Sequence, residues 1–319
     1  MSSAAIVTTL KYQGPSLITF VEYHLAIGFE RIYLMFDDPM DPDQDLVAAI
    51  PGVKVLPVDE GIKAQWQSLY KYKQYGPHIN TEVRARQTLN AELALNMALK
   101  EGIEWILHID SDELLWLSQS TIHTHLERLA EQEIICASYM NYEAVPDKEE
   151  VSNYFLEVTA FKKPRRLLEK QGVDVNALWQ LPRKYFNFYN NGKSMCRVRQ
   201  DMVPDDVHKW RSRSEHISTA RYFHPAILHY ACCGYDSFKS KFEKLINTGN
   251  KAEEFGVSMK DKGFTVDYDA TMAYLQHDES RAREIYRNQV MLDTESIESY
   301  ITAGVMERID ISSRLKTDE

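Results

Sequence analysis

The chain has 319 residues, enough to bury a large core as one α/β domain or as a domain with an appended segment. Its 37 basic and 47 acidic side chains give a formal charge of −10, which argues against a general nucleic-acid binder and against a protein that binds anionic membranes. No apolar run reaches the length of a membrane span, no export signal is recognisable, and the four cysteines have neither zinc-site spacing nor the density of a disulfide framework. We therefore expect a cytoplasmic protein without a transmembrane segment, either free or peripheral at the inner face of a membrane.

The first third of the sequence alternates apolar strands with helices. Strands are predicted at Ala4–Leu10, Arg31–Phe36, Val53–Val58 and Trp105–Ile109. Helices are predicted from Ser16 to about Ile27, and from a cap at Asn80 or Thr81 to Gly102. Acidic or polar residues follow the strands at their carboxyl ends, where open α/β sheets bind ligands. The pattern predicts a doubly wound α/β fold with a mostly parallel central sheet and flanking helices.

The rest of the chain changes character twice. A helix at Thr121–Gln132 and a strand at Glu133–Tyr142 precede a β-rich, aromatic segment at Val151–Val203, in which Asn190-Asn191-Gly192 is a hairpin-turn signal. Helices are predicted at Tyr235–Ile246, Asp278–Met291 and Thr294–Ile309, and the tail Ser312–Glu319 is expected to be frayed. We therefore expect one domain over residues 1–234 and a helical extension over residues 235–319 that packs on it.

The acidic run Asp110-Ser111-Asp112-Glu113 directly follows the apolar strand Trp105–Ile109. In an extended chain alternate side chains point the same way, so Asp110 and Asp112 can face one ligand. Burying two carboxylates without partners is costly, which implies a cation or tightly hydrogen-bonded groups beside them. Such oxygen ligands suit Mg²⁺ or Mn²⁺. The alternative is an ordinary turn, because Asp and Ser are common after strands.

Other residues have both a functional and a structural explanation. Arg84 and Arg86 lie near the start of the predicted long helix, where cations are unfavourable to the helix dipole unless an anion compensates. They are phosphate candidates, and a solvated helix face is the alternative. Lys193 follows a glycine in the predicted hairpin, so its amine could approach a diphosphate, or it could be a turn lysine. His229 follows an apolar run and, taken alone, fits a hydrogen-bonded core histidine better than a metal ligand.

Several stretches resemble GT-A-fold glycosyltransferases of the family 2-like and family 92-like group. They are Lys11 to Gly28, with Val21-Glu22-Tyr23-His24-Leu25; Glu104 to Leu115, which reads EWILHIDSDELL; Gly192-Lys193-Ser194; and Ile227-Leu228-His229-Tyr230 leading into Ser237 to Phe242. These motifs keep their order over about three quarters of the chain, which is more specific than any one of them. One departure is Lys11-Tyr12-Gln13, where the family usually has Lys-Asn-Glu.

The resemblance implies a GT-A glycosyltransferase that moves a hexosyl or pentosyl group from a UDP- or GDP-sugar to a glycan or lipid-linked acceptor in polysaccharide biosynthesis. Its DxD pattern implies that Asp110, Asp112 and His229 bind Mn²⁺ or Mg²⁺, which bridges the donor diphosphate. Donor contacts are expected from Lys11, Asp37, Arg86, Asp110, Ser111 and Lys193. We expect inversion, which requires a carboxylate base at the acceptor hydroxyl, and Asp206 and Glu143 are the candidates.

Two other functions stay open at the level of the sequence. A metal-dependent nucleotidyltransferase would use the same metal and nucleotide, although the chain has no Gly-rich, Lys-containing N-terminal loop of the kind such chemistry uses. A non-catalytic carbohydrate-binding protein of GT-A fold would not need a metal that bridges a diphosphate. The C-terminal helices could serve acceptor binding or a homodimer, and no nucleic-acid partner is expected.

Overall fold

A computed structural model describes residues 2–175, 185–247 and 251–315. The chain separates into two compact units. Unit 1 comprises Met1–Met140, Asn191–Ile227 and Ser312–Glu319, and unit 2 comprises Asn141–Asn190 and Leu228–Ile311. Each unit is built from segments that are distant in sequence. The boundary expected between residues 234 and 235 stays a prediction.

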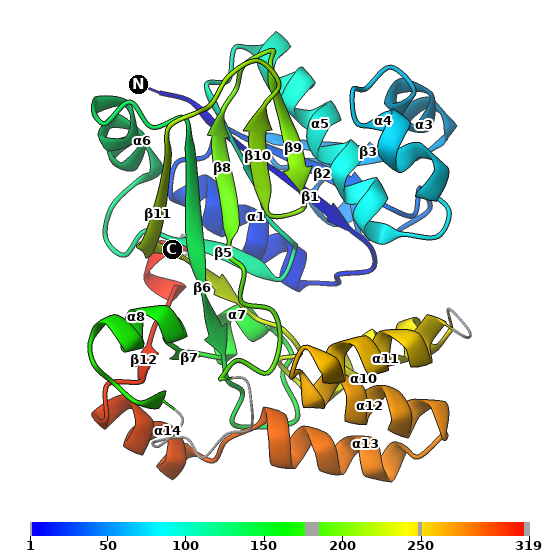
Figure 1. Cartoon of the computed structure of the whole chain (residues 1–319), viewed down its shortest axis with the longest axis vertical. Coiled ribbons are helices and arrows are strands. Elements are labelled where there is room, and N and C mark those ends of the chain that lie inside the picture. The colour runs from blue at the N-terminus through cyan, green and yellow to red at the C-terminus, as the bar shows by residue number, and fades with distance from the viewer. Residues whose placement is uncertain (1, 176–184, 248–250, 316–319) are drawn as a thin grey trace. The chain divides into compact units, whose positions relative to one another are not determined.

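Unit 1 contains the parallel strands that the sequence predicts (Figure 1). They are β1 (Ala4–Leu10), β2 (Arg31–Phe36), β3 (Val53–Pro57) and β4 (Trp105–His108), in the spatial order β4-β1-β2-β3. The register places Ile6 beside Ile32 on one side and Leu107 on the other. These three side chains are fully buried, as expected for strands covered on both faces. The bounds predicted for β1 and β2 are confirmed, and β3 and β4 each end one residue early.

The other half of the sheet in unit 1 is antiparallel. β8 (Lys193–Arg197) pairs with β4 on one side and with the beginning of β6 (Cys136–Ala144) on the other. β9 (Met202–Asp206) and β10 (Lys209–Ser212) form a separate two-stranded sheet. Two further strands are β5 (Glu113–Trp116) and β11 (Thr219–His229). The α/β class is confirmed, with a sheet that is parallel from β3 to β4 and antiparallel beyond β4.

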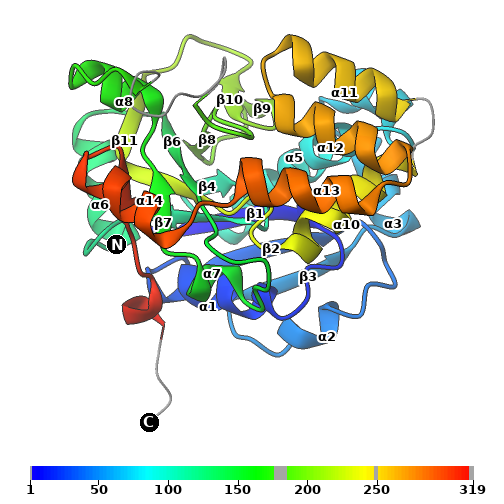
Figure 2. The same ribbon diagram turned by 90° about the horizontal axis from the view of Figure 1, so that it is seen from below.

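Helices cover both faces of the parallel strands in unit 1. Figure 2 shows α1 (Ser16–Ala26) and α2 (Gln44–Val47) on one side of β1 to β3 and α5 (Val83–Glu101) on the other. Smaller helices are α3 (Glu60–Trp66), α4 (Tyr72–Tyr75), a 3₁₀ turn at Gly76–His78, α6 (Ile122–Glu131) and a 3₁₀ turn at Ser312–Arg314. α5 ends at Gly102 in a left-handed conformation (φ 75°), as predicted. It begins at Val83, two residues beyond the nearer of the two predicted caps.

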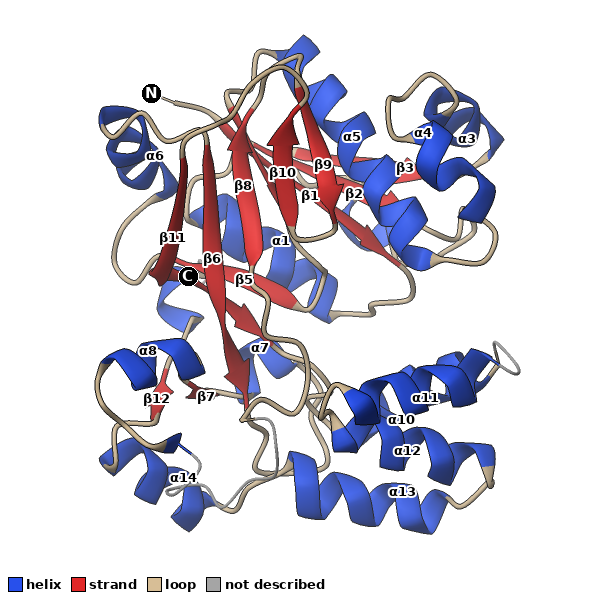
Figure 3. Ribbon diagram, in the orientation of Figure 1, coloured by secondary structure: helices blue, strands red, loops and turns tan. Residues whose placement is uncertain are grey.

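Unit 2 combines a short strand pairing with a group of helices (Figure 3). β7 (Ala160–Lys162) pairs with the end of β6 and with β12 (Met306–Arg308). The helices are α7 (Tyr154–Glu157), α8 (Arg165–Lys170), α10 (Tyr235–Ile246), α11 (Lys251–Asp261), α12 (Thr265–Leu275), α13 (Glu279–Ile285), a π-helical turn at Tyr286–Val290, and α14 (Thr294–Thr302). Aromatic side chains such as Phe238, Phe242 and Tyr286 form much of the core between α10, α12 and α13.

Three predictions need correction in this part of the chain. The β-rich prediction for Val151–Val203 is wrong at α7 and α8, which flank β7. α8 forms because Pro164 precedes a short run of good helix formers. The helix predicted at Thr294–Ile309 ends at Thr302, since Gly304 adopts φ 76° and the chain then extends into β12. The predicted frayed tail is a 3₁₀ turn at its start, and residues 316–319 lie outside the described residues. Within the described residues no helix is long and apolar enough to cross a membrane.

Candidate functional site

The acidic run lies at the carboxyl end of β4, in a turn closed by its own hydrogen bonds. The Glu113 N–H donates to the carbonyl oxygen of Asp110 at 3.1 Å, and Glu113 Oε2 accepts from the Asp110 N–H at 2.9 Å. Ser111 Oγ donates to Oε1 of Gln13, in the loop after β1, at 2.7 Å. Because β1 and β4 are parallel neighbours, the loops at their carboxyl ends meet at one edge of the sheet. The structure thus brings Ser111 to the loop that follows the first strand.

The cation beside this run is the ammonium group of Lys193, the first residue of β8. Its side chain is fully buried, with Nζ 2.6 Å from Asp110 Oδ2 and 3.5 Å from Glu113 Oε2. The other oxygen of Asp110 accepts a hydrogen bond from Gln87 Nε2 on α5 at 2.9 Å. Both carboxylate oxygens of Asp110 are therefore engaged within the protein, although its side chain is one-third exposed.

The two carboxyl groups that touch Lys193 titrate in opposite directions. Burial alone would raise the pKa of Asp110, but the charge of Lys193 and its hydrogen bond overcome burial and lower the pKa to about 2. For Glu113, burial raises the pKa to about 8, with Lys193 opposing this and Asp110 and Asp112 adding to it. Burial would lower the pKa of Lys193, yet the adjoining carboxylates raise it. At neutral pH the ammonium thus pairs with Asp110, and Glu113 is mostly protonated.

The acidic run carries carboxylate oxygens, the type of ligand that Mg²⁺ and Mn²⁺ prefer. Among the residues that the structure describes, no group of three or more His, Cys, Asp or Glu side chains is arranged to hold a metal ion. Asp110 is engaged by Gln87 and Lys193, and the carboxylate of Asp112, two residues along the run, is half-buried. Mg²⁺ in nucleotide sites is usually held by one or two carboxylates together with substrate phosphates, and the run meets that requirement.

The predicted histidine ligand belongs to unit 2. His229 ends β11 and is buried, and its ring lies edge-on to that of Tyr189 with 5.6 Å between the centroids. Its place in a metal site stays a prediction.

The predicted donor contacts on the neighbouring loops interact with one another. The guanidinium of Arg86 forms a two-pronged pair with Asp37, with Nε 2.5 Å from Oδ1 and Nη2 2.7 Å from Oδ2, and its Nη1 donates to the carbonyl of Ile79 at 2.8 Å. Lys11 Nζ lies 3.2 Å from Asp38 Oδ2, and the lysine side chain is 45% exposed. Asp37 and Arg86 thus tie α5 to the loop after β2, whereas Lys11 keeps much of its surface open to solvent.

Asp206 lies at the end of β9, two residues before His208. Asp206 Oδ1 accepts from the N–H of His208 at 2.7 Å. Burial and the charge of Lys193 together lower the pKa of the His208 imidazole to about 4, although the carboxylates of Asp110 and Asp206 oppose them. The exposed Arg84 also lowers the pKa of His208. A neutral imidazole therefore adjoins the Lys193 ion pair.

Glu143, the other predicted base, is in unit 2 and its side chain is 2% exposed. Lys162 Nζ lies 3.3 Å from its Oε2, and its two oxygens accept from the N–H groups of Asn187 and Phe188 at 3.0 and 2.8 Å. These bonds fix the backbone of the segment that carries Asn187. As a base Glu143 would first have to lose these partners, so the geometry supports a structural role for it.

Gln13 and Gln87 are site residues that sequence reasoning missed. Both glutamines are uncharged, and only the fold brings Gln13 to Ser111 and Gln87 to Asp110. His208 is a weaker ligand candidate than His229 from the sequence, and its position two residues after Asp206, at the turn of the β9–β10 hairpin, is the signal that could have raised its rank.

Comparison with known proteins finds two relatives that are both named as glycosyltransferase-like. No family model matches the chain. Two proteins of Arabidopsis thaliana, both named glycosyltransferase-like, are 28% and 26% identical to it over 92% of its length. The chain spans 67% of the first relative and 59% of the second.

Solved structures show weaker likeness. The mannosyltransferase Ktr4p from S. cerevisiae in complex with GDP has a TM-score of 0.28 at 8% identity, covering 46% of this chain and 42% of that one. Core-mannan synthase A from Aspergillus fumigatus, in its Mn/GDP form, has a TM-score of 0.30 at 7% identity, covering 62% of this chain and 60% of that one. Scores at this level reflect partial likeness only.

Proposed function

We propose that this chain is a glycosyltransferase of GT-A fold, which transfers a hexosyl or pentosyl group from a UDP- or GDP-sugar to a glycan or lipid-linked acceptor. The observation that carries the proposal is the cluster of Asp110, Ser111, Asp112 and Lys193 at the carboxyl end of β4, tied through Gln13 to the loop after β1. Open α/β sheets bind nucleotides at this edge. The similarity to glycosyltransferase-like proteins over 92% of the chain supports the same reaction class.

The proposed reaction forms one bond and breaks one bond. The acceptor hydroxyl oxygen bonds to the anomeric carbon of the donor, and the bond from that carbon to the diphosphate oxygen breaks. The electron pair leaves with the nucleoside diphosphate, and the hydroxyl proton passes to a carboxylate. Asp206 is the proposed base, because it lies at a strand end and binds the N–H of His208, whose imidazole feels the charge of Lys193. A carboxylate base at the acceptor hydroxyl leads to an inverting reaction.

Electrostatics explain what Lys193 contributes to such a site. A diphosphate would be repelled by two or three ionised carboxylates in the run. The buried ammonium offsets the charge of Asp110, and burial raises the pKa of Glu113 to about 8, which favours its protonated form. The run therefore presents little net negative charge beyond that of Asp112. A Mn²⁺ or Mg²⁺ ion held by Asp112, with His229 as a proposed further ligand, would supply Lewis-acid stabilisation of the departing diphosphate.

The other residues predicted to contact the nucleotide sugar divide into those that bind it and those that position the edge of the sheet. Ser111 and the half-exposed Lys11 are the donor contacts, through a hydroxyl and a cation at the sheet edge. Asp37 and Arg86 hold each other and α5, so they position the edge rather than bind the nucleotide.

Release of nucleoside diphosphate from a panel of UDP- and GDP-sugars, with and without Mn²⁺, tests the proposal. We expect release with at least one donor, and about a 100-fold loss for Asp112→Asn. Asp45→Asn, an exposed aspartate on α2, is the matched control and should keep wild-type activity. Chelation followed by Mn²⁺ addition isolates the metal requirement. The proposal fails if no donor is bound or cleaved, and its metal part fails alone if full activity survives chelation.

A further inference from the structure

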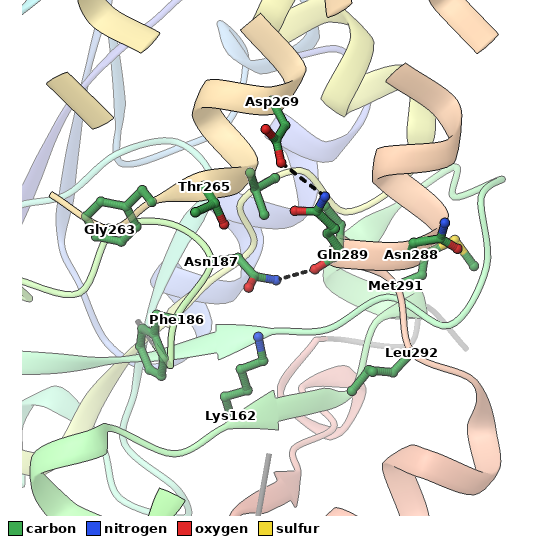
Figure 4. A pocket seen from close by; sticks show the side chains of 13 residues that line it. Lys162, Phe186, Asn187, Gly263, Thr265, Asp269, Asn288, Gln289, Met291 and Leu292 are labelled. Atoms are coloured by element: carbon green, nitrogen blue, oxygen red, sulfur yellow. Dashed lines mark hydrogen bonds between the residues drawn. The ribbon is translucent and has the colours of Figure 1, made fainter. Parts of the chain in front are cut away.

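Unit 2 contains a cavity of about 460 Å³ whose lining includes no residue of the acidic run. Figure 4 shows it between the end of β7, the segment with Phe186 and Asn187, the start of α12 and the π-helical turn. Small-molecule sites in proteins have about this volume, roughly 300–1,000 Å³. Its volume is enough for a ligand of a few rings. The hydrogen-bonding groups and the charge of its lining side chains then indicate which kind of ligand it binds.

Side chains with unused hydrogen-bonding groups line this cavity. Asn187 Nδ2 donates to the carbonyl of Gln289 at 2.8 Å, and Gln289 Nε2 lies 3.3 Å from Asp269 Oδ2. These bonds leave the side-chain oxygen of Asn187 and one carboxylate oxygen of Asp269 available to accept hydrogen bonds from a ligand. The side chains of Thr265 and Asn288 make no hydrogen bond within the described residues. The cavity therefore offers donors and acceptors from amide, carboxylate and hydroxyl groups.

The lining is close to neutral, with a slight excess of negative charge. Lys162 is the one cationic side chain among the described residues that line it, and its ammonium is 3.3 Å from the buried carboxylate of Glu143. Asp269 adds a negative charge without a cation beside it among the lining side chains. A phosphate or another anion would find no unpaired positive charge here, so a neutral polar ligand fits best.

Two local features fix the polar side chains in place. Glu143 binds the N–H groups of Asn187 and Phe188, which holds the segment that presents Asn187 to the cavity. Asn288 and Gln289 lie on the π-helical turn Tyr286–Val290, a rare backbone form that often occurs at functional sites. The cavity thus combines pre-positioned amides with apolar surface from Phe186 and Met291.

We propose that this cavity binds a neutral saccharide, whose hydroxyl groups pair with Asp269, Asn288 and Asn187 and whose C–H face packs on Phe186 and Met291. The saccharide is part of the acceptor glycan, and this assignment rests on the proposed transferase function. A neutral polyol matches the mixture of amides, carboxylate and apolar surface, and it needs no counter-charge.

Binding of the full chain to an array of neutral oligosaccharides of glucose, galactose, mannose, xylose and arabinose tests the inference, followed by calorimetry with the tightest ligand. We expect Asp269→Ala and Asn288→Ala each to raise Kd by about ten-fold, the effect of one lost hydrogen bond to a polar ligand. Asn288 is exposed and without a hydrogen bond in the described chain, so at least that variant should fold, and thermal unfolding checks both. Asp261→Ala, on the neighbouring α11 and outside the cavity, is the matched control and should bind as wild type.

The inference is overturned if wild type binds no neutral saccharide, if both folded variants bind as wild type, or if phosphorylated oligosaccharides bind better than neutral ones. Nucleoside diphosphate release by wild type is measured on the same samples. Saccharide binding that both variants weaken, without any donor cleavage, would support the cavity and refute the transferase. Donor cleavage without saccharide binding would refute the cavity alone.

Discussion

Replacing Lys193 with methionine tests whether its ammonium holds the acidic run in place. Lys193 is fully buried, and its Nζ is 2.6 Å from Asp110 Oδ2. Methionine keeps most of the volume of the lysine stem, so little is lost through packing. The change therefore removes mainly a charge and its hydrogen bond.

The expected loss of unfolding free energy depends on the hydrogen bonds and solvent contact that Asp110 and Glu113 keep without the ammonium. A hydrogen bond to a charged group contributes about 1.5–3 kcal/mol, and a fully uncompensated buried charge costs about 3–5 kcal/mol. Asp110 is one-third exposed and keeps its bond from Gln87, and Glu113 is mostly protonated at neutral pH. The Lys193→Met variant should thus lose about 2–3 kcal/mol of unfolding free energy in unit 1, below the cost of an isolated buried charge.

Urea unfolding followed by tryptophan fluorescence measures this loss. Four of the five tryptophans lie in unit 1, namely Trp66, Trp105, Trp116 and Trp210. A double-mutant cycle with Asp110→Asn should give a coupling energy of about 2 kcal/mol, because each single change breaks the same pair. Lys209→Met, which removes an exposed lysine on β10, is the matched control and should change stability by less than about 0.5 kcal/mol. A coupling energy below about 0.5 kcal/mol would show that Lys193 does not hold Asp110 as the structure indicates.

Two further predictions concern unit 1. Burial lowers the pKa of His24 to about 3, although one ring nitrogen donates to a backbone carbonyl and the other accepts from a backbone N–H. The unfolded chain takes up a proton at this histidine below about pH 6.5 and the folded chain does not, so the free energy of unfolding falls as the pH falls, by about 1.6 kcal/mol between pH 6.5 and 5. His24→Gln should remove that share of the pH dependence of urea unfolding, and an unchanged pH dependence would contradict the argument. Gly192 has φ 77°, and an added Cβ would overlap the carbonyl oxygen of Tyr139, so Gly192→Ala should cost more than about 2 kcal/mol. Gly102→Ala, at φ 75° with open space around it, should cost about 1–2 kcal/mol, and equal melting temperatures for the two variants would refute the clash.

The parallel half of the sheet could be predicted because its signal is local. Ala4–Leu10 and Arg31–Phe36 are continuous apolar runs bounded by polar residues, and both strands have these bounds in the structure. The helix that ends at Gly102 was predictable for a similar reason, since a glycine in the left-handed conformation ends many helices.

The elements that the sequence did not predict depend on long-range pairing. Glu113–Trp116 forms a strand directly behind an acidic turn, and Met306–Arg308 forms one only because Ala160–Lys162 lies beside it. Neither segment has an alternation that distinguishes a strand from the end of a helix. Periodicity over a few residues cannot replace knowledge of the partner strand.

For the acidic run, too, the sequence predicts the local chemistry but not the long-range contact. The sequence required a cation or hydrogen-bond partners near Asp110 and Asp112, and the requirement follows from desolvation alone. It did not identify the cation, because Lys193 lies 83 residues further along the chain and reaches Asp110 only through the pairing of β4 with β8. With that ammonium in place, the run no longer needs a metal ion to offset the charge of Asp110. Mn²⁺ at Asp112 would then gain most of its ligands from the diphosphate, so metal and nucleotide should each strengthen the binding of the other by the same factor.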